Sequence, residues 1–138
     1  NGAAYDPVLR DKLARAHVGL EVMRAHALRT LHSVTSGTSG TESSVAKLLW
    51  AHWHRSLGEL AMQVRGASSL IEGEPGGADG GLDEWQRLFL FTRADTIAGG
   101  TDEIQRNIIA ERTLGLPREE LPGKGQPYGE VLRSIKPV

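Results

Sequence analysis

Hydrophobic residues recur at steps of three and four along the first quarter of the chain. This spacing places them on one face of a helix, and most charged side chains lie off that face. Asp6 followed by Pro7 is a start signal, because aspartate caps a helix N-terminus and proline's missing N–H costs nothing in the first turn. We predict one long helix over residues 7–34, with an apolar face made of Leu9, Leu13, Ala16, Leu20, Met23, Ala27 and Leu31.

A second helical pattern follows a linker of small residues at 36–41. We expect Ser44 to cap this helix and Gly66 to lie near its end. Trp50 falls at the edge of the apolar face. Tryptophans on helices are more often core or interface residues than ligand platforms, and one at an edge favours a subunit contact. The inner face is predicted to consist of Val45, Leu48, Leu49, Trp53, Leu57, Leu60 and Val64.

Two shorter helices are predicted after a glycine-rich loop at residues 72–81. The third helix starts at Leu82 or Asp83, and a hinge of two glycines separates it from the fourth, at 101–114. The third helix is predicted to use Trp85, Leu88, Phe89 and Phe91 as its apolar side.

No stretch alternates apolar and polar residues over the length of a strand. An isolated helix is marginal in water, so the helices must pack on one another, with roughly 1.5–3 kcal/mol gained per large side chain buried. We therefore predict an all-α fold, an antiparallel four-helix bundle, over residues 1–119. Residues 120–138 contain prolines at 122, 127 and 137, and they are predicted to form an irregular tail with at most one turn around 128–134.

The composition excludes several classes of function. The chain has 138 residues, a net charge of −1 and no cysteine. It therefore has no field that attracts nucleic acid or an anionic membrane, and no disulfide, thiolate metal site or cysteine nucleophile. No apolar run approaches the roughly 20 residues of a membrane span, and no signal segment opens the chain, so we expect a cytoplasmic protein. Because the first residue is Asn1, we interpret the chain as a product or piece of something longer.

Metal and phosphate motifs are missing from the sequence. The five histidines form no His-x-x-x-His or Glu-x-x-His pair, so no metal site is predicted and we expect surface or core-edge positions for them. The glycine-rich run at 73–81 lacks the Lys-Ser/Thr of a phosphate-binding loop. No serine has a base in a recognisable arrangement, so a nucleophilic serine is not predicted.

Residues 97–117 carry the most informative pattern. Thr101 can cap the fourth helix, and Asp102 and Glu103 place negative charge against the positive end of the helix dipole. One interpretation is a capped helix after a tight turn. The other is a ligand site, because the two preceding glycines let a phosphate or ribityl oxygen approach the free amides closely.

The run Ile-Ala-Gly-Gly-Thr-Asp-Glu-Ile-Gln-Arg-Asn-Ile-Ile-Ala-Glu-Arg at 97–112 resembles the C-terminal signature of the acyl-CoA dehydrogenases. Residues 9–31, 44–64 and 85–96 resemble the earlier helices of that family's C-terminal bundle, so the resemblance extends to about Glu119. It implies the C-terminal domain of an FAD-dependent enzyme that removes two hydrogens across the α,β bond of an acyl-CoA thioester. It also implies electron-transfer flavoprotein as the usual electron acceptor, homo- or hetero-oligomers built on the bundles, and FAD where two subunits meet.

The same resemblance implies two sets of FAD-contacting residues. The first set follows the hinge, and the second set, at the end of the second helix, reaches the nucleotide half of FAD. Together they are Gly100, Thr101, Glu103, Gln63, Gly66 and Ala67.

This sequence departs from the family pattern at three places. The position of the usual catalytic glutamate holds Gly99, and glycine cannot abstract a proton, so we assign no catalytic residue and expect the isolated chain to be inactive. Ala67 and Ser68 stand where the family usually has a leucine-glycine-glycine run, and no Arg-x-x-Phe-Gly motif precedes Asp6. A second hypothesis is therefore a non-catalytic partner subunit of a heteromeric acyl-CoA dehydrogenase.

Overall fold

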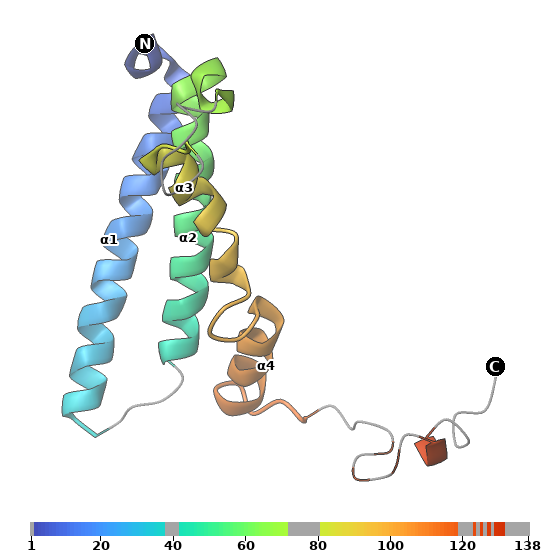
Figure 1. The fold of residues 1–138 in the computed structure, drawn as a ribbon. Helices are drawn as coiled ribbons and strands as arrows, with labels where there is room; N and C mark the ends of the chain where they lie inside the picture. The colour runs from blue at the N-terminus through green and yellow to red at the C-terminus, as the bar shows by residue number, and fades with distance from the viewer. Residues whose placement is uncertain are drawn as a thin grey trace.

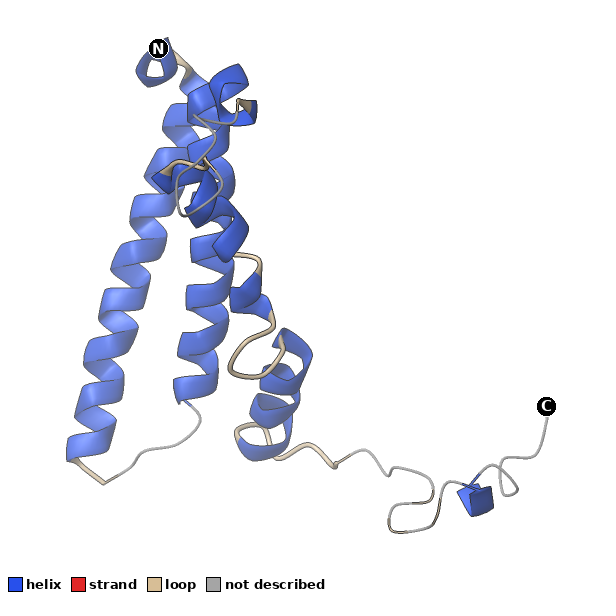
Figure 2. Cartoon of the chain, viewed as in Figure 1, coloured by secondary structure: helices blue, strands red, loops and turns tan. Residues whose placement is uncertain are grey.

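The computed structural model describes residues 2–37, 42–71 and 81–118, together with 123, 125, 127 and 129–131. This part of the chain contains helices and turns and no strand (Figure 2). The predicted all-α fold is confirmed. In chain order its helices are η1 (Gly2–Tyr5), α1 (Pro7–Thr35), α2 (Glu42–Arg65), η2 (Gly66–Leu70), α3 (Glu84–Phe91), η3 (Ala94–Thr96) and α4 (Asp102–Arg112), the η elements being short 3-10 helices.

Helix α1 begins where the sequence predicts. The Asp6 carboxylate accepts hydrogen bonds from the backbone N–H groups of Val8 and Leu9, at 2.8 and 3.3 Å, and Pro7 occupies the first turn. The helix ends at Thr35, one residue beyond the predicted end. The aspartate-proline pair therefore determines the start of the longest helix.

Helix α2 begins at Glu42, so the prediction that Ser44 caps it is wrong. Ser44 lies inside the first turn and is buried. Several hydroxyl side chains in this stretch are equally suited to capping, and a glutamate in the first turn favours the earlier start because of its interaction with the helix dipole. The predicted end is confirmed, since α2 stops at Arg65 and Gly66 has a left-handed φ of +61°.

Helix α3 begins after Asp83, as predicted. The Asp83 carboxylate accepts from the N–H groups of Trp85 and Gln86, and the Gln86 amide oxygen accepts from the N–H of Asp83. The buried Gln86 amide also donates to the carbonyl oxygens of Ser69 and Ile71, at 3.0 and 2.9 Å. One side chain thus caps α3 and ties it to the segment after α2. Residues 72–80 of the predicted loop lie outside the described residues.

Helix α2 is the central element of the arrangement. Helix α1 runs antiparallel to it on one side, while α3, η3 and α4 follow one another along its other side in the opposite direction to α2 (Figure 1). Helices α3 and α4 each contact α2. The predicted all-α, antiparallel fold is confirmed, since α1, α3 and α4 each contact α2 and run opposite to it, with α3 and α4 end to end along one side.

The core formed by this chain alone is small. Among the described residues, the buried hydrophobic side chains are those of Ala51 and Leu60, both on α2, and α1 has no buried residue at all. Much of the predicted apolar face of α1 is exposed, including Leu13, Leu20 and Leu31. Of the predicted face only Leu9, Ala16 and Met23 are half-buried. The remaining half-buried positions of α1 are Gly19, His26, Thr30 and Ser33, so the sequence pattern locates the packed side of this helix only in part.

The predicted tail is described only in part. Residues 129–131 are helical, and the N–H of Glu130 donates to the carbonyl oxygen of Pro127 at 2.9 Å. This agrees with a single turn in that region. The remainder of the proposed 120–138 tail lies largely outside the described residues, and its boundary stays a prediction.

Candidate functional site

The glycine hinge joins η3 to α4 and is open on one side. Gly99 and Gly100 both have left-handed backbones, with φ of +68° and +93°. A Cβ atom added to Gly99 would meet nothing within 4 Å, whereas one on Gly100 would lie 2.9 Å from Nε2 of Gln105. That same Nε2 donates to the carbonyl oxygen of Gly99 at 2.8 Å. The hinge is therefore held from inside by the buried Gln105 amide, and its outer side has space.

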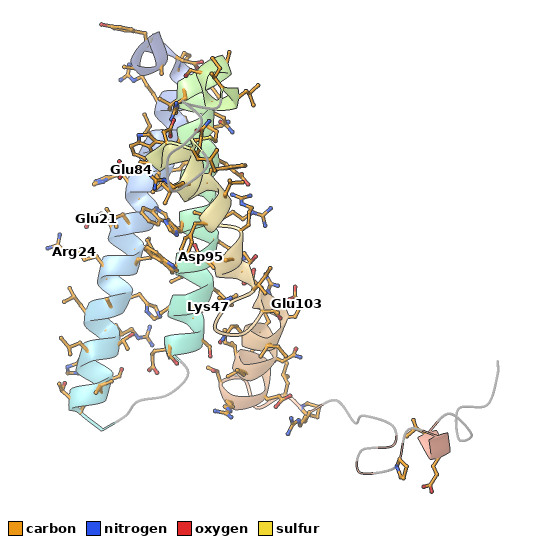
Figure 3. All side chains as sticks on the ribbon, in the orientation of Figure 1. Glu21, Arg24, Lys47, Glu84, Asp95 and Glu103 are labelled. Carbon is orange, nitrogen blue, oxygen red and sulfur yellow. The ribbon has the colours of Figure 1, made fainter. Side chains whose placement is uncertain are left out.

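Thr101 and Glu103 lie together at the start of α4. Thr101 is the N-cap, and its Oγ1 accepts from the N–H of Ile104 at 3.4 Å, as the sequence predicts. Hydrogen bonds from the backbone N–H of Glu103 itself and from the Thr101 hydroxyl lower the pKa of the Glu103 carboxyl. The Glu103 side chain is 77% exposed and extends away from α2 (Figure 3). Two of the hinge-side residues predicted to contact FAD are thus accessible from outside.

Asp102, the residue between them, points inward to α2. Its Oδ1 lies 3.1 Å from Nζ of Lys47, and its Oδ2 lies 2.7 Å from Nε2 of His52. Asp102 is only 8% exposed. Burial raises the pKa of the Asp102 carboxyl, but the hydrogen bonds with His52 and Lys47 together lower it by a larger amount. The net pKa of Asp102 is therefore below its ordinary value.

No local sequence pattern indicates the Asp102 cluster. From the sequence, Asp102 has only a role toward the helix dipole. Its partners lie 50 and 55 residues away along the chain, and no local spacing rule links them. Only the packing of α4 on α2 brings these three side chains together.

The second predicted set lies at the far end of α2. The amide oxygen of the exposed Gln63 accepts a hydrogen bond from Nζ of Lys12 on α1 at 2.6 Å. Gly66 is exposed and would have nothing within 4 Å of an added Cβ, and Ala67 is also exposed. From His52, near the hinge, to Gln63 the helix rises about 16 Å, at 1.5 Å per residue. Within one chain, the hinge residues and the residues at the end of α2 therefore lie apart (Figure 1).

A groove between α1 and α2 connects the two regions. It has a volume of about 450 Å³ and extends along α2 from His52 to Gln63, with Lys12 and Arg15 on the α1 side. His52 is half-exposed in this groove while it contacts Asp102. The groove wall is thus continuous with the cluster that holds the start of α4.

Two histidines of α2, His52 and His54, each contact an aspartate. In the described ranges no group of three or more His, Cys, Asp or Glu side chains is placed to hold a metal ion. His54 lies 2.6 Å from Asp95, measured from Nδ1 to Oδ2, and both side chains are largely buried.

None of the helices in the described ranges has the length and apolarity that crossing a membrane requires.

Comparison with known proteins agrees with the fold and with the hinge sequence. The family model for the C-terminal domain of acyl-CoA dehydrogenases matches residues 2–114. The chain belongs to the acyl-CoA dehydrogenase family. This confirms the resemblance that the sequence at 97–112 indicates and identifies the helices as the C-terminal domain of that family.

Individual relatives show the same membership. The chain is 58% identical over 117 residues to acyl-CoA dehydrogenase IpdE1 of Mycobacterium tuberculosis, covering 85% of this chain and 29% of that protein. It is 54% identical over 118 residues to IpdE1 of Mycolicibacterium smegmatis, covering 86% of this chain and 28% of that protein. A solved structure named Tcur3481-Tcur3483 steroid ACAD matches with a TM-score of 0.71 and 26% identity, over 86% of this chain and 31% of that chain. The chain thus spans less than a third of the length of these relatives.

Proposed function

We propose that this domain is part of an FAD-dependent acyl-CoA dehydrogenase, in which it supplies part of the FAD site and part of the oligomer interface. The observation that carries the proposal is the hinge, where two left-handed glycines leave an open approach to the backbone before the capped start of α4. The 58% identity to a protein named acyl-CoA dehydrogenase supports the reaction class.

The residues at the hinge fit a flavin dinucleotide. In this proposal the Gly100 backbone and the Thr101 hydroxyl bind FAD oxygens from the open side of the hinge, and Glu103 orients the Thr101 hydroxyl. At the far end of α2, Gln63 and the small residues Gly66 and Ala67 contact the nucleotide half. FAD, when bound, supplies the hydride acceptor for dehydrogenation of the substrate. The separation of the two sets along α2 supports contact with FAD at subunit boundaries.

Gly99 supplies no catalytic base, and its backbone suits glycine. A residue with a side chain at a φ of +68° would be strained by about 1 kcal/mol or more. The base that takes the α-proton is therefore proposed to lie outside this chain, either on another segment of the same protein or on a partner subunit.

The second candidate function is a non-catalytic subunit of a heteromeric acyl-CoA dehydrogenase. Gly99 is compatible with it, and the name of the solved neighbour, Tcur3481-Tcur3483 steroid ACAD, joins two components. The test is to purify the full-length protein alone and to follow bleaching of its flavin by acyl-CoA. Bleaching without a second subunit supports the first candidate, and bleaching only after a second subunit is added supports the alternative.

The substrate and partners follow from the same proposal. The substrate is an acyl-CoA thioester, and the neighbour's name favours a steroid-derived acyl group. Electron-transfer flavoprotein is the proposed electron acceptor, and the bundle is proposed to form a homo- or hetero-oligomer. A cytoplasmic location stays a prediction, which cell fractionation would test.

The hinge assignment is tested by Thr101→Val in the full-length protein. Loss of one hydrogen bond is expected to weaken FAD retention by ~0.5–1.5 kcal/mol. The matched control is Thr35→Val, since Thr35 lies at the end of α1 and its hydroxyl bonds only locally, to the carbonyl oxygen of His32. Flavin content and thermal midpoint equal to those of the control would contradict the assignment.

A further inference from the structure

Both carboxylate oxygens of Asp102, at the start of α4, contact side chains of α2. Oδ1 lies 3.1 Å from the Lys47 ammonium and Oδ2 lies 2.7 Å from the His52 imidazole. Lys47 and Asp102 are both largely buried, with side-chain exposures of 17% and 12%. Hydrogen bonds to charged groups are among the stronger ones in proteins, and burial limits their screening by water. The start of α4 is therefore fixed on α2 by two directed contacts.

The Asp102 contacts also orient the glycine hinge relative to α2. Asp102 directly follows Thr101, and two glycines with wide conformational freedom precede them. Gln105 fixes the hinge to its own helix through the carbonyl oxygen of Gly99, but it does not tie the hinge to α2. The Asp102 contacts do so. They determine where along α2, and in which direction, the Thr101 hydroxyl and the Gly100 backbone are presented.

We infer that Asp102 is a positioning residue for flavin binding, and that Lys47 and His52 hold it against α2 so that Gly100 and Thr101 meet FAD in one fixed geometry. This inference rests on the proposed function, because it takes the hinge to be the FAD contact. Asp102 itself does not touch FAD. Its side chain is buried on α2, while the open side of the hinge is at Gly99.

The experiment compares variants of the full-length flavoprotein, with FAD as the probe. Asp102→Asn and Lys47→Met are each expected to raise the FAD dissociation constant about tenfold and to change the visible circular dichroism of the bound flavin. Lys47→Arg keeps the cation and is expected to restore most of the affinity. Asp11→Asn is the matched control, because Asp11 makes an exposed ion pair with Arg15 on α1, and it is expected to change neither quantity.

A second comparison separates positioning from general stability. Gly58→Ala perturbs the α2–α3 contact, away from the hinge. If Asp102→Asn weakens FAD binding more than Gly58→Ala does at an equal loss of thermal midpoint, the inference is supported. If the two variants have equal FAD affinity and the same flavin dichroism, Asp102 is only structural and the inference is overturned.

Thr101→Val distinguishes failure of this inference from failure of the proposed function. A loss of FAD affinity in Thr101→Val without any loss in Asp102→Asn overturns the positioning role and leaves the hinge assignment standing. No loss in either variant overturns both. If Asp102→Asn does not fold, Lys47→Met and its Lys47→Arg counterpart give the same decision, because they leave the carboxylate in place.

Discussion

The indole of Trp53 fills the space that a methyl group on Gly19 would need. A Cβ atom placed on Gly19 would lie 2.6 Å from Cδ1 of Trp53, and Nε1 of Trp53 donates to the carbonyl oxygen of Ala16 at 2.7 Å. This contact fixes where the two long helices approach each other. Toward the linker after α1, the two helices diverge (Figure 1).

Gly19→Ala is therefore expected to destabilise the protein. Alanine gains up to about 1 kcal/mol in a helix interior relative to glycine, but overpacking against a rigid indole costs about 1–3 kcal/mol. We expect a lower thermal midpoint in the full-length protein. In a Trp53→Leu background the same change is expected to be neutral or stabilising, because the clash is gone. A midpoint raised by Gly19→Ala in the wild-type background would show that α1 can shift to accommodate the methyl group.

Gly58→Ala is expected to loosen the contact between α2 and α3. A Cβ atom there would lie 3.0 Å from Oγ1 of the fully buried Thr92 and 3.2 Å from the Cα of Phe89. Because backbone atoms cannot rotate away, we expect a loss of about 1–3 kcal/mol in unfolding free energy, measured by urea denaturation. In a Thr92→Ala background, which removes Oγ1 at 3.0 Å and the methyl group at 3.4 Å, Gly58→Ala is expected to cost less than it does in the wild-type background. An equal loss in both backgrounds would place the strain at Phe89 alone.

Because of the Asp102 contacts, we expect the free energy of unfolding to fall in acid. The pKa of Asp102 is lowered in the folded protein, so its contribution is present above the unfolded pKa of about 3.9 and is lost as the pH falls through the lower folded pKa. The stability difference between wild type and Asp102→Asn should be constant near neutral pH and shrink below about pH 4. Urea midpoints at a series of pH values would measure it. A difference that stays constant down to pH 2 would contradict the folded-state ion pairing of Asp102.

We expect the protein to self-associate through the surface of α1 and α2 around Trp50. It is 46% exposed on α2 and lines a groove of about 490 Å³ that α1 shares, with Met23 and Leu31. Trp50→Glu is expected to shift the full-length protein toward smaller species in sedimentation equilibrium. Val18→Glu is the control, since Val18 is 60% exposed on α1 and lies outside that groove. A wild-type protein that is monomeric at high micromolar concentration would rule out this use of the surface.

Much of the fold could be predicted because its signals are local. The caps at Asp6, Asp83 and Thr101 each bind amides within three residues, so sequence spacing alone identifies them. The hinge glycines are likewise predictable from neighbouring residues. The start of α2 is not, because several capping residues stand side by side around Ser44, and which of them caps the helix depends on how α2 packs.

The polar part of the site could not be predicted in the same way. The contacts of Asp102 with Lys47 and His52, and of Gln63 with Lys12, join residues at least 50 positions apart. They depend on the relative register of whole helices, which no single helix encodes. The apolar face of α1 is predicted only in part, since Gly19, His26 and Thr30 are half-buried where Leu20, Ala27 and Leu31 are exposed. Its exposure depends on what covers it, and in the part of the chain that the structure describes α1 packs mainly on α2.

The uneven burial of the helices has a consequence for hydrogen exchange. Helix α1 has no buried residue, whereas α2 contacts neighbours on both sides and contains Ala51 and Leu60. Backbone amides exchange through local opening, which costs least where few apolar contacts are lost. In this domain separated from the rest of its protein, the amide protons of α1 would exchange before those of α2. In the full-length protein the protection of α1 would report how much of its surface other segments or subunits cover.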